Sequence, residues 1–142
     1  MYNITASAQE LKDYYAGHET ELPVYNEDYI KCIVRAIKRY YVDRNHPEEY
    51  GLTLFVTDED EILYYDFDFN IVQEEYIFIL AKLEFKRKER SDISGDGAIS
   101  YTTNALSVTG AKEGYKSIQE EIDDLEHERR IVFHKMMALE EG

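Results

Sequence analysis

The most regular pattern of apolar residues in the chain lies at its C-terminal end. Over residues 110–139, apolar side chains recur in alternating steps of three and four, which places them along one side of an α-helix. They are Tyr115, Ile118, Ile122, Leu125, Val132, Met136 and Leu139. A helix over this range would be about 45 Å long, more than a domain of this size easily covers. The stripe therefore predicts a long helix that packs against another helix or a partner.

The same spacing predicts three further helices, over residues 6–16, 27–43 and 72–90. Ser7 and Glu10 are spaced as a capping box for the first helix, with Thr5 as an alternative cap and Gly17 placed to end it. Asn26 can cap the second helix. One face of that second helix is apolar, and the other carries Lys31, Arg35, Lys38 and Arg39.

Residues 52–69 predict a β-hairpin with an acidic turn over 57–60. In its second strand, the apolar residues Tyr65, Phe67 and Phe69 alternate with polar residues, so one face is apolar and the other charged. An isolated hairpin is only marginally stable in water. We therefore expect its apolar face to pack against the neighbouring helices.

Residues 91–108 contain glycine, serine and threonine without a sustained period, which predicts an exposed and mobile loop. Loops of this length are commonly functional or become ordered by a partner. The whole pattern predicts one domain over residues 1–142 that is mainly α-helical. It consists of four helices, the last of them long, and an inserted β-hairpin.

Composition narrows the function without naming it. The chain has 142 residues, 44% of them hydrophobic, and a net charge of −14, which opposes binding to a phosphate backbone. We therefore expect no direct sequence-specific binding of nucleic acid. Cys32 is the single cysteine, so no disulfide can form within the chain, and a reducing compartment is the simplest setting. No leader segment or long apolar run stands out, and we expect a soluble protein that does not enter a membrane.

The sequence does not predict an enzyme or a cofactor. It contains no nucleophile elbow, no phosphate-binding glycine loop and no convincing Cys/His pair. His127 and His134 are seven residues apart and do not form the His-Glu-x-x-His pattern of zinc enzymes. Solvent-facing or interface positions are the favoured interpretation of these histidines.

A partial calcium-binding pattern occurs in the 91–108 segment. Asp92, Ser94 and Asp96 match the first, third and fifth positions of an EF-hand loop, and Gly97 matches its turn glycine. The twelfth position, which should supply a bidentate carboxylate, is Thr103. A calcium-binding module with Asp92, Ser94 and Asp96 as ligands is therefore an alternative hypothesis, against an ordinary loop.

Two charged segments are candidates for interaction. Asp58, Glu59 and Asp60 form the acidic hairpin turn, which can either contact a basic partner or keep the sheet edge soluble. Arg87 and Lys88 belong to a basic run at the end of the third helix. Between copies of the chain, the acidic turn of one could meet the basic run of the next in a head-to-tail contact.

The stripe of the last helix is interrupted by Arg129. A buried unpaired charge is costly, so Arg129 argues against a long dry two-stranded coil. We expect the half before Arg129 to pack internally and the half after it to be a docking surface. The residues of this candidate docking surface are Ile131, Val132, Phe133, Met136 and Met137.

Residues 72–139 resemble the head-to-tail connector, or neck adaptor, proteins of tailed bacteriophages. The resemblance is carried by the amphipathic helix Glu75-Tyr-Ile-Phe-Ile-Leu-Ala-Lys-Leu-Glu-Phe-Lys-Arg-Lys, the polar segment Ile99-Ser-Tyr-Thr-Thr-Asn-Ala-Leu-Ser-Val-Thr-Gly and the long charged terminal helix. The hairpin at residues 52–69 departs from the compact four-helix form of such adaptors.

This resemblance implies a virion component without catalysis, made in the host cytoplasm. It would form an oligomeric ring between the portal and the neighbouring tail or neck proteins, with the terminal helix and the 91–108 loop contacting the portal. A second hypothesis is an acidic inhibitor that mimics DNA toward a nucleic-acid-binding protein. The net charge favours it, but acidic and basic residues alternate in most of the predicted helices, whereas a mimic concentrates one sign on one face.

Overall fold

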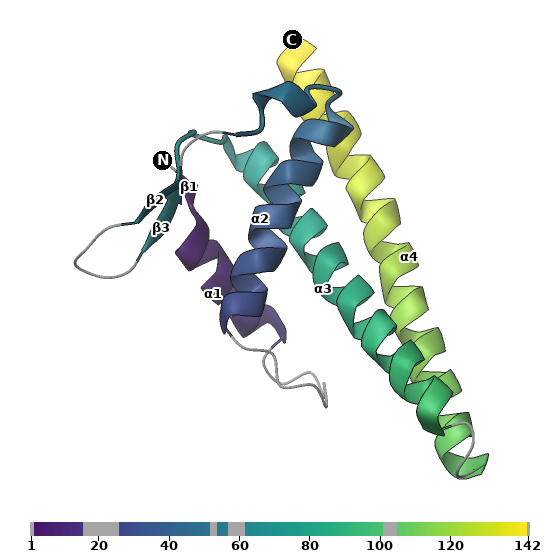
Figure 1. Ribbon diagram of the computed structural model, residues 1–142. Helices are drawn as coiled ribbons and strands as arrows, with labels where there is room; N and C mark the ends of the chain where they lie inside the picture. Colours follow the sequence, from purple (N-terminus) through teal and green to yellow (C-terminus); the bar gives the residue numbers. More distant parts are fainter. Residues whose placement is uncertain (1, 16–25, 52–53, 57–61, 101–104, 142) are drawn as a thin grey trace.

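The protein is mainly α-helical, as the sequence predicts, with a small antiparallel sheet at one side (Figure 1). A computed structural model describes residues 2–15, 26–51, 54–56, 62–100 and 105–141, with side chains over 2–15, 27–51, 62–91 and 116–140. The helices are α1 (Ile4–Tyr15), α2 (Asn26–Asp43), α3 (Ile71–Ser100) and α4 (Ala105–Glu141). The strands are β1 (Tyr2–Asn3), β2 (Leu54–Val56) and β3 (Leu63–Tyr65), and a short 3-10 turn, η1, covers Pro47–Glu49.

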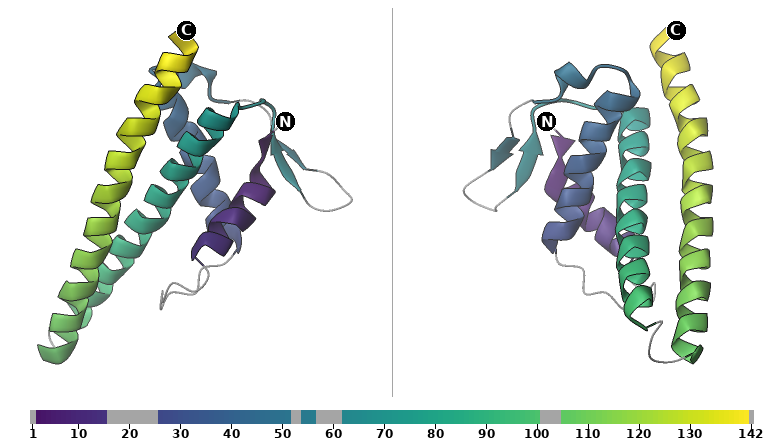
Figure 2. Two further views of the ribbon diagram at one scale, coloured as in Figure 1. Left: turned by 180° about the vertical axis from the view of Figure 1, so that it is seen from behind. Right: turned by 45° about the vertical axis from the view of Figure 1, so that its right-hand side comes forward.

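Helix α3 is the central element. It lies between α2 and α4, with α1 packed on the same side as α2 (Figure 2). Helices α3 and α4 form a long antiparallel hairpin, and its closed end extends beyond α1 and α2 (Figure 1). The molecule therefore consists of a compact part, built by all four helices, and a projecting part, built by α3 and α4 alone.

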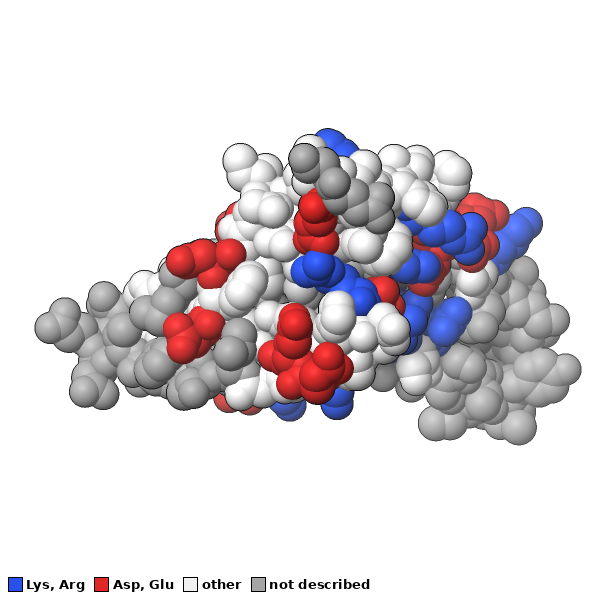
Figure 3. Space-filling model, turned by 90° about the horizontal axis from the view of Figure 1, so that it is seen from above, with Lys and Arg blue, Asp and Glu red and all other residues white. Residues whose placement is uncertain are grey.

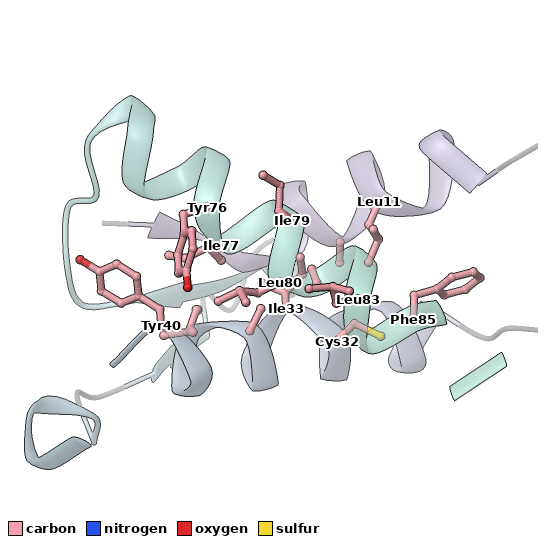
Figure 4. Packing of buried hydrophobic residues seen from close by; sticks show 14 of the residues in the cluster. Leu11, Cys32, Ile33, Tyr40, Tyr76, Ile77, Ile79, Leu80, Leu83 and Phe85 are labelled. Atoms are coloured by element: carbon pink, nitrogen blue, oxygen red, sulfur yellow. The ribbon is translucent and has the colours of Figure 1, made fainter. Parts of the chain in front are cut away.

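Apolar residues around much of its circumference explain why α3 is covered on two sides. Ile77, Leu80 and Leu83 are buried together with Leu11 of α1 and Ile33 of α2 (Figure 4). On the other side, α4 contributes the buried residues Ile118, Ile122, Val132 and Met136. Burying one such side chain stabilises a fold by about 1.5–3 kcal/mol relative to leaving it exposed, so α3 requires both neighbours.

Two groups of aromatic rings fix α2 against the rest of the fold. At its N-terminal end, Tyr29 and Tyr15 stack on Phe85, with ring centroids 5.7 and 4.2 Å away. At its C-terminal end, Tyr40 meets Phe69 edge to face at 5.4 Å, and Phe69 in turn stacks on Tyr65 of β3 at 6.0 Å. The second group anchors the sheet to the helices, as an otherwise marginal hairpin requires.

The sheet differs from the predicted hairpin in two ways: its second strand ends earlier, and a third strand, β1, is added. Its strand order is β1-β3-β2, with Tyr2 and Leu54 both opposite Tyr65. The second strand ends at Tyr65 rather than Phe69, because the backbone N–H of Phe67 turns back to the carbonyl of Tyr65 at 2.8 Å. The predicted hairpin is therefore present with a second strand that ends earlier, and β1 is an addition that the sequence pattern did not indicate.

The N-caps predicted for the first helix are wrong, and Gly17, expected to end it, lies outside the described residues. Helix α1 begins at Ile4, and the side-chain oxygen of Asn3 accepts the backbone N–H of Ala6 at 2.9 Å, which makes Asn3 the N-cap. Ser7 is consequently inside the helix. The hydroxyl of Thr5 instead accepts the backbone N–H of Leu63 at 2.8 Å, and this bond ties α1 to β3.

Helix α3 begins with a capping box that the sequence analysis missed. Asn70 accepts the backbone N–H of Gln73 through its side chain, while the Gln73 side chain accepts the backbone N–H of Asn70, each at 2.9 Å. This reciprocal pair satisfies two donors that a helix start otherwise leaves unpaired. It fixes the start of α3 directly after the sheet.

The expected mobile loop over residues 91–108 is largely helical backbone. Helix α3 continues to Ser100 and α4 begins at Ala105, so the interruption between them is confined to residues 101–104, which lie outside the described residues. Glycine costs about 1 kcal/mol in a helix interior, and Gly95 and Gly97 made a loop the simpler expectation. Pairing of α3 with α4 along the hairpin provides the tertiary support that overrides this preference.

Removing the N-cap of α3 should destabilise the protein. We expect Asn70→Ala to lower the free energy of unfolding by about 1 kcal/mol, because the backbone N–H of Gln73 loses its partner. Urea denaturation followed by circular dichroism measures this change. The control is Glu75→Ala at an exposed position of the same helix, which should stay within about 0.5 kcal/mol. Equal effects of the two substitutions would contradict the role of the cap.

The aromatic core predicts unfolding in alkali. Burial raises the pKa of Tyr2 to about 12 and raises the pKa values of five further tyrosines, namely Tyr15, Tyr29, Tyr40, Tyr41 and Tyr76. Above about pH 10 the unfolded chain loses tyrosine protons that the folded chain retains, so stability falls as the pH rises. Each such tyrosine contributes about 1.4 kcal/mol per pH unit. Tyrosinate absorbance should appear together with the loss of helical circular dichroism, and ionisation of most tyrosines well before that loss would contradict the prediction.

Candidate interaction surfaces

Arg129, which interrupts the apolar stripe of α4, is paired across three helices. Its Nη1 donates to the Tyr76 hydroxyl of α3 at 3.3 Å and lies 3.7 Å from the Asp43 carboxylate of α2. Its Nε donates to Glu126 at 2.8 Å. The Tyr76 hydroxyl donates to Asp43 at 2.5 Å, and Arg39 pairs with the same carboxylate at 2.9 Å. The charge in the seam is therefore compensated from within the chain.

The pKa values of this network follow from its geometry. Burial and the hydrogen bond to Asp43 raise the pKa of Tyr76, so its hydroxyl keeps the proton that it donates. Burial opposes the charge of Arg129, but hydrogen bonds to Tyr76 and Glu126 outweigh it and raise the pKa of the guanidinium. Arg129 therefore stays charged, and the network serves to join the helices.

The expected docking surface after Arg129 is mostly internal. Val132 and Met136 are 5% and 1% exposed, and the Phe133 ring lies 5.6 Å from the Tyr76 ring. Met137 also packs against the core. Of this set only Ile131 is exposed, at 56%. Because Arg129 finds its partners within the chain, α4 continues along α3 on both sides of it, and these residues do not form a free surface in this fold.

The basic run at residues 86–90 is likewise used within the chain. Arg87 pairs with Glu126 of α4 at 2.5 Å, and Lys88 pairs with Asp28 of α2 at 3.0 Å. Lys86 pairs with Glu89 at 3.3 Å and also with Glu121, and Arg90 donates to Gln119 at 2.8 Å. The run therefore joins α3 to its neighbours. Its predicted counterpart, the acidic turn of Asp58, Glu59 and Asp60, lies outside the described residues.

The three calcium candidates lie where the backbone is helical. Asp92, Ser94 and Asp96 belong to the last turns of α3, whereas an EF-hand ligand set needs a loop that wraps around the ion. Among the side chains that the structure describes, no group of three potential metal ligands is assembled.

His127 and His134 are exposed on α4.

A group of cations on α2 can be read from the sequence, but only the fold shows how it differs from the basic run at residues 86–90. We define the basic stripe as Lys31, Arg35 and Lys38, which lie four and three residues apart on the exposed face of α2. Within the described part of the chain, these three side chains take part in no ion pair. A pairing pattern that only the fold reveals therefore distinguishes this stripe from the run at 86–90.

Helix α4 carries a stripe of the opposite sign. We define the acidic stripe as Glu120, Asp124 and Glu128, which recur every four residues on the exposed face of α4. No ion pair engages these carboxylates among the residues for which side chains are described. Glu121 and Glu126, which face α3, are the α4 carboxylates paired with its basic run.

Comparisons with protein-family models, curated proteins and solved structures find no match to this chain. In the described part of the chain, no helix has both the length and the apolar character required to cross a membrane.

Substituting Arg129, and separately the adjacent exposed residue Arg130, tests whether the Arg129 network stabilises the fold. We expect Arg129→Leu to lower the free energy of unfolding by about 2 kcal/mol, since Tyr76, Asp43 and Glu126 each lose a charged partner. Arg130→Leu removes the same charge from an exposed position and should change stability by less than about 0.5 kcal/mol. Chemical denaturation of both variants measures the difference. A stable Arg129→Leu protein would show that the network adds nothing to the packing of α4.

Proposed function

We propose that this chain is a non-enzymatic structural protein of a virion, a head-to-tail connector that docks between the portal and the tail as an oligomeric ring. The observation that carries this proposal is the α3–α4 hairpin, which projects beyond the compact part of the molecule (Figure 1). The resemblance to neck adaptor proteins covers the same two helices. A projecting, internally braced hairpin suits a protein that acts by inserting into a partner.

The use of charged residues supports this proposal. The ion pairs of Arg87, Lys88 and Arg129 all join one helix to another, which stiffens the base of the hairpin. The connecting segment at residues 101–104 belongs to the polar Ser/Thr stretch of the resemblance. A braced base with a polar connecting segment can dock by shape, and little free energy is then lost in ordering the helices on binding.

The acidic DNA-mimic hypothesis has less support. A mimic needs carboxylates gathered on one face without intervening cations. On the face seen from above, acidic and basic side chains lie beside one another among uncharged residues (Figure 3). The basic stripe of α2 would also repel a nucleic-acid-binding surface.

Affinity purification of the tagged chain from its native source, with mass spectrometry of the bound proteins, tests the proposal. We expect portal and tail proteins to co-purify. A variant with residues 101–104 replaced by glycine and serine should lose the portal protein, because that segment connects the two helices at the end of the hairpin. Glu10→Ala, at an exposed position on α1, is the matched control and should retain every partner. Recovery of a polymerase, nuclease or repressor would contradict the connector function and favour the mimic.

A further inference from the structure

We propose that copies of this chain associate head to tail, with the basic stripe of α2 on one copy binding the acidic stripe of α4 on the next. This inference rests on the proposed ring and names the surfaces that would close it. It replaces the contact expected from the sequence, since Arg87 and Lys88 are already paired within the chain. It uses charges that take part in no ion pair among the described residues.

The basic stripe is unusual for this protein. The chain carries a net charge of −14, and most cations near a helix contact are neutralised by a carboxylate, as Arg39 is by Asp43. Lys31, Arg35 and Lys38 nevertheless lie together on one exposed helix face without an ion pair among the described residues. Three adjacent cations repel one another, so an acidic partner surface would relieve a cost that the isolated chain bears.

The acidic stripe matches the basic stripe in length and form. Lys31 to Lys38 spans about 10 Å of helix, and Glu120 to Glu128 spans about 12 Å, at 1.5 Å per residue. The residues of both stripes are exposed, and the basic stripe lies opposite the residues of α2 that pack on α3. Two helices laid alongside each other could therefore place each cation close to a carboxylate.

The positions of the stripes allow a ring. Helices α2 and α4 flank α3 on different sides (Figure 2), and among the described residues no ion pair joins one stripe to the other. Their heights along α3 overlap. Lys88 pairs with Asp28, just before the basic stripe, and Lys86 pairs with Glu121, near the start of the acidic stripe. From these points α2 and α4 run in the same direction (Figure 1). A contact between different surfaces with little axial shift favours closure into a ring over growth into a steep filament.

A second copy fits the basic stripe better than nucleic acid does. Binding to a phosphate backbone gains free energy from cations, but the whole chain carries nearly twice as many acidic as basic residues, thirty against sixteen. A second copy brings the matching carboxylates on a defined helix. Each copy carries both stripes, so in a closed ring every basic stripe would face an acidic stripe.

Sedimentation of the full chain over a range of concentrations measures the association. We expect its average mass to rise with concentration at about 0.01 M salt and to return to that of a monomer at about 1 M salt, where charges are screened within about 3 Å. Arg35→Glu with Lys38→Glu should weaken association by about tenfold or more, because attraction becomes repulsion. Arg130→Glu with Lys135→Glu makes the same change of net charge at exposed positions outside both stripes. This control should stay within about twofold of the unaltered chain.

A charge exchange tests the pairing directly. Glu120→Lys with Asp124→Lys should also prevent association of that variant with itself. Mixing it with the Arg35→Glu, Lys38→Glu variant should restore assembly, since the reversed surfaces are again complementary. Monomers at every concentration, equal effects of the stripe and control variants, or no recovery on mixing would each overturn the inference. Binding of duplex DNA that is lost in the Arg35→Glu, Lys38→Glu variant would assign the stripe to nucleic acid and overturn it too.

The two proposals can fail separately. Portal and tail proteins could co-purify with the chain while its self-association is unaffected by the stripe substitutions. That result would leave the connector function in place and remove only this inference. Charge-dependent association without portal or tail proteins would do the opposite.

Discussion

The burial of α3 on two sides is the constraint on which the rest of the structure depends. Between Tyr76 and Phe85, α3 carries apolar residues over so wide an arc that neither side can face water, and α1 and α2 cover only one side of it. The remaining side needs a helix as long as α3 itself, and α4 provides it. The other features follow from this arrangement, including the compact part, the projecting hairpin and the position of Arg129 in the seam.

Features set by local spacing could be predicted from the sequence. The four helices and the hairpin follow from periods of apolar residues, and the ends of α2 agree with the prediction to within a residue. The two-residue strand β1 is too short to carry a period, and it forms only because Tyr65 of β3 offers an edge. Asn70 and Gln73 have the spacing of a capping box, but the apolar pattern from which the start of α3 was predicted begins only after Asn70.

The candidate surfaces were predicted less well, because a sequence displays charges without their partners. Lys88 looks free beside other cations, yet its carboxylate comes from the distant residue Asp28. Arg129 looks like an interruption for the same reason, since Asp43 and Tyr76 belong to other helices. Conversely, the sequence places the cations of the basic stripe on one face of α2, and only the fold shows that, among the described residues, they take part in no ion pair while Lys88 does.

The pairing of Arg129 also selects one alignment of the two long helices. Apolar stripes on α3 and α4 could make similar contacts after a slide of one helical turn, about 5.4 Å. Such a slide would draw the guanidinium away from Asp43 and Tyr76 and leave a charge unpaired in a largely apolar seam. A single polar residue thereby specifies the alignment, as polar residues in coiled-coil seams do. The length over which α3 and α4 overlap, and therefore the reach of the hairpin, is consequently a fixed property of the molecule.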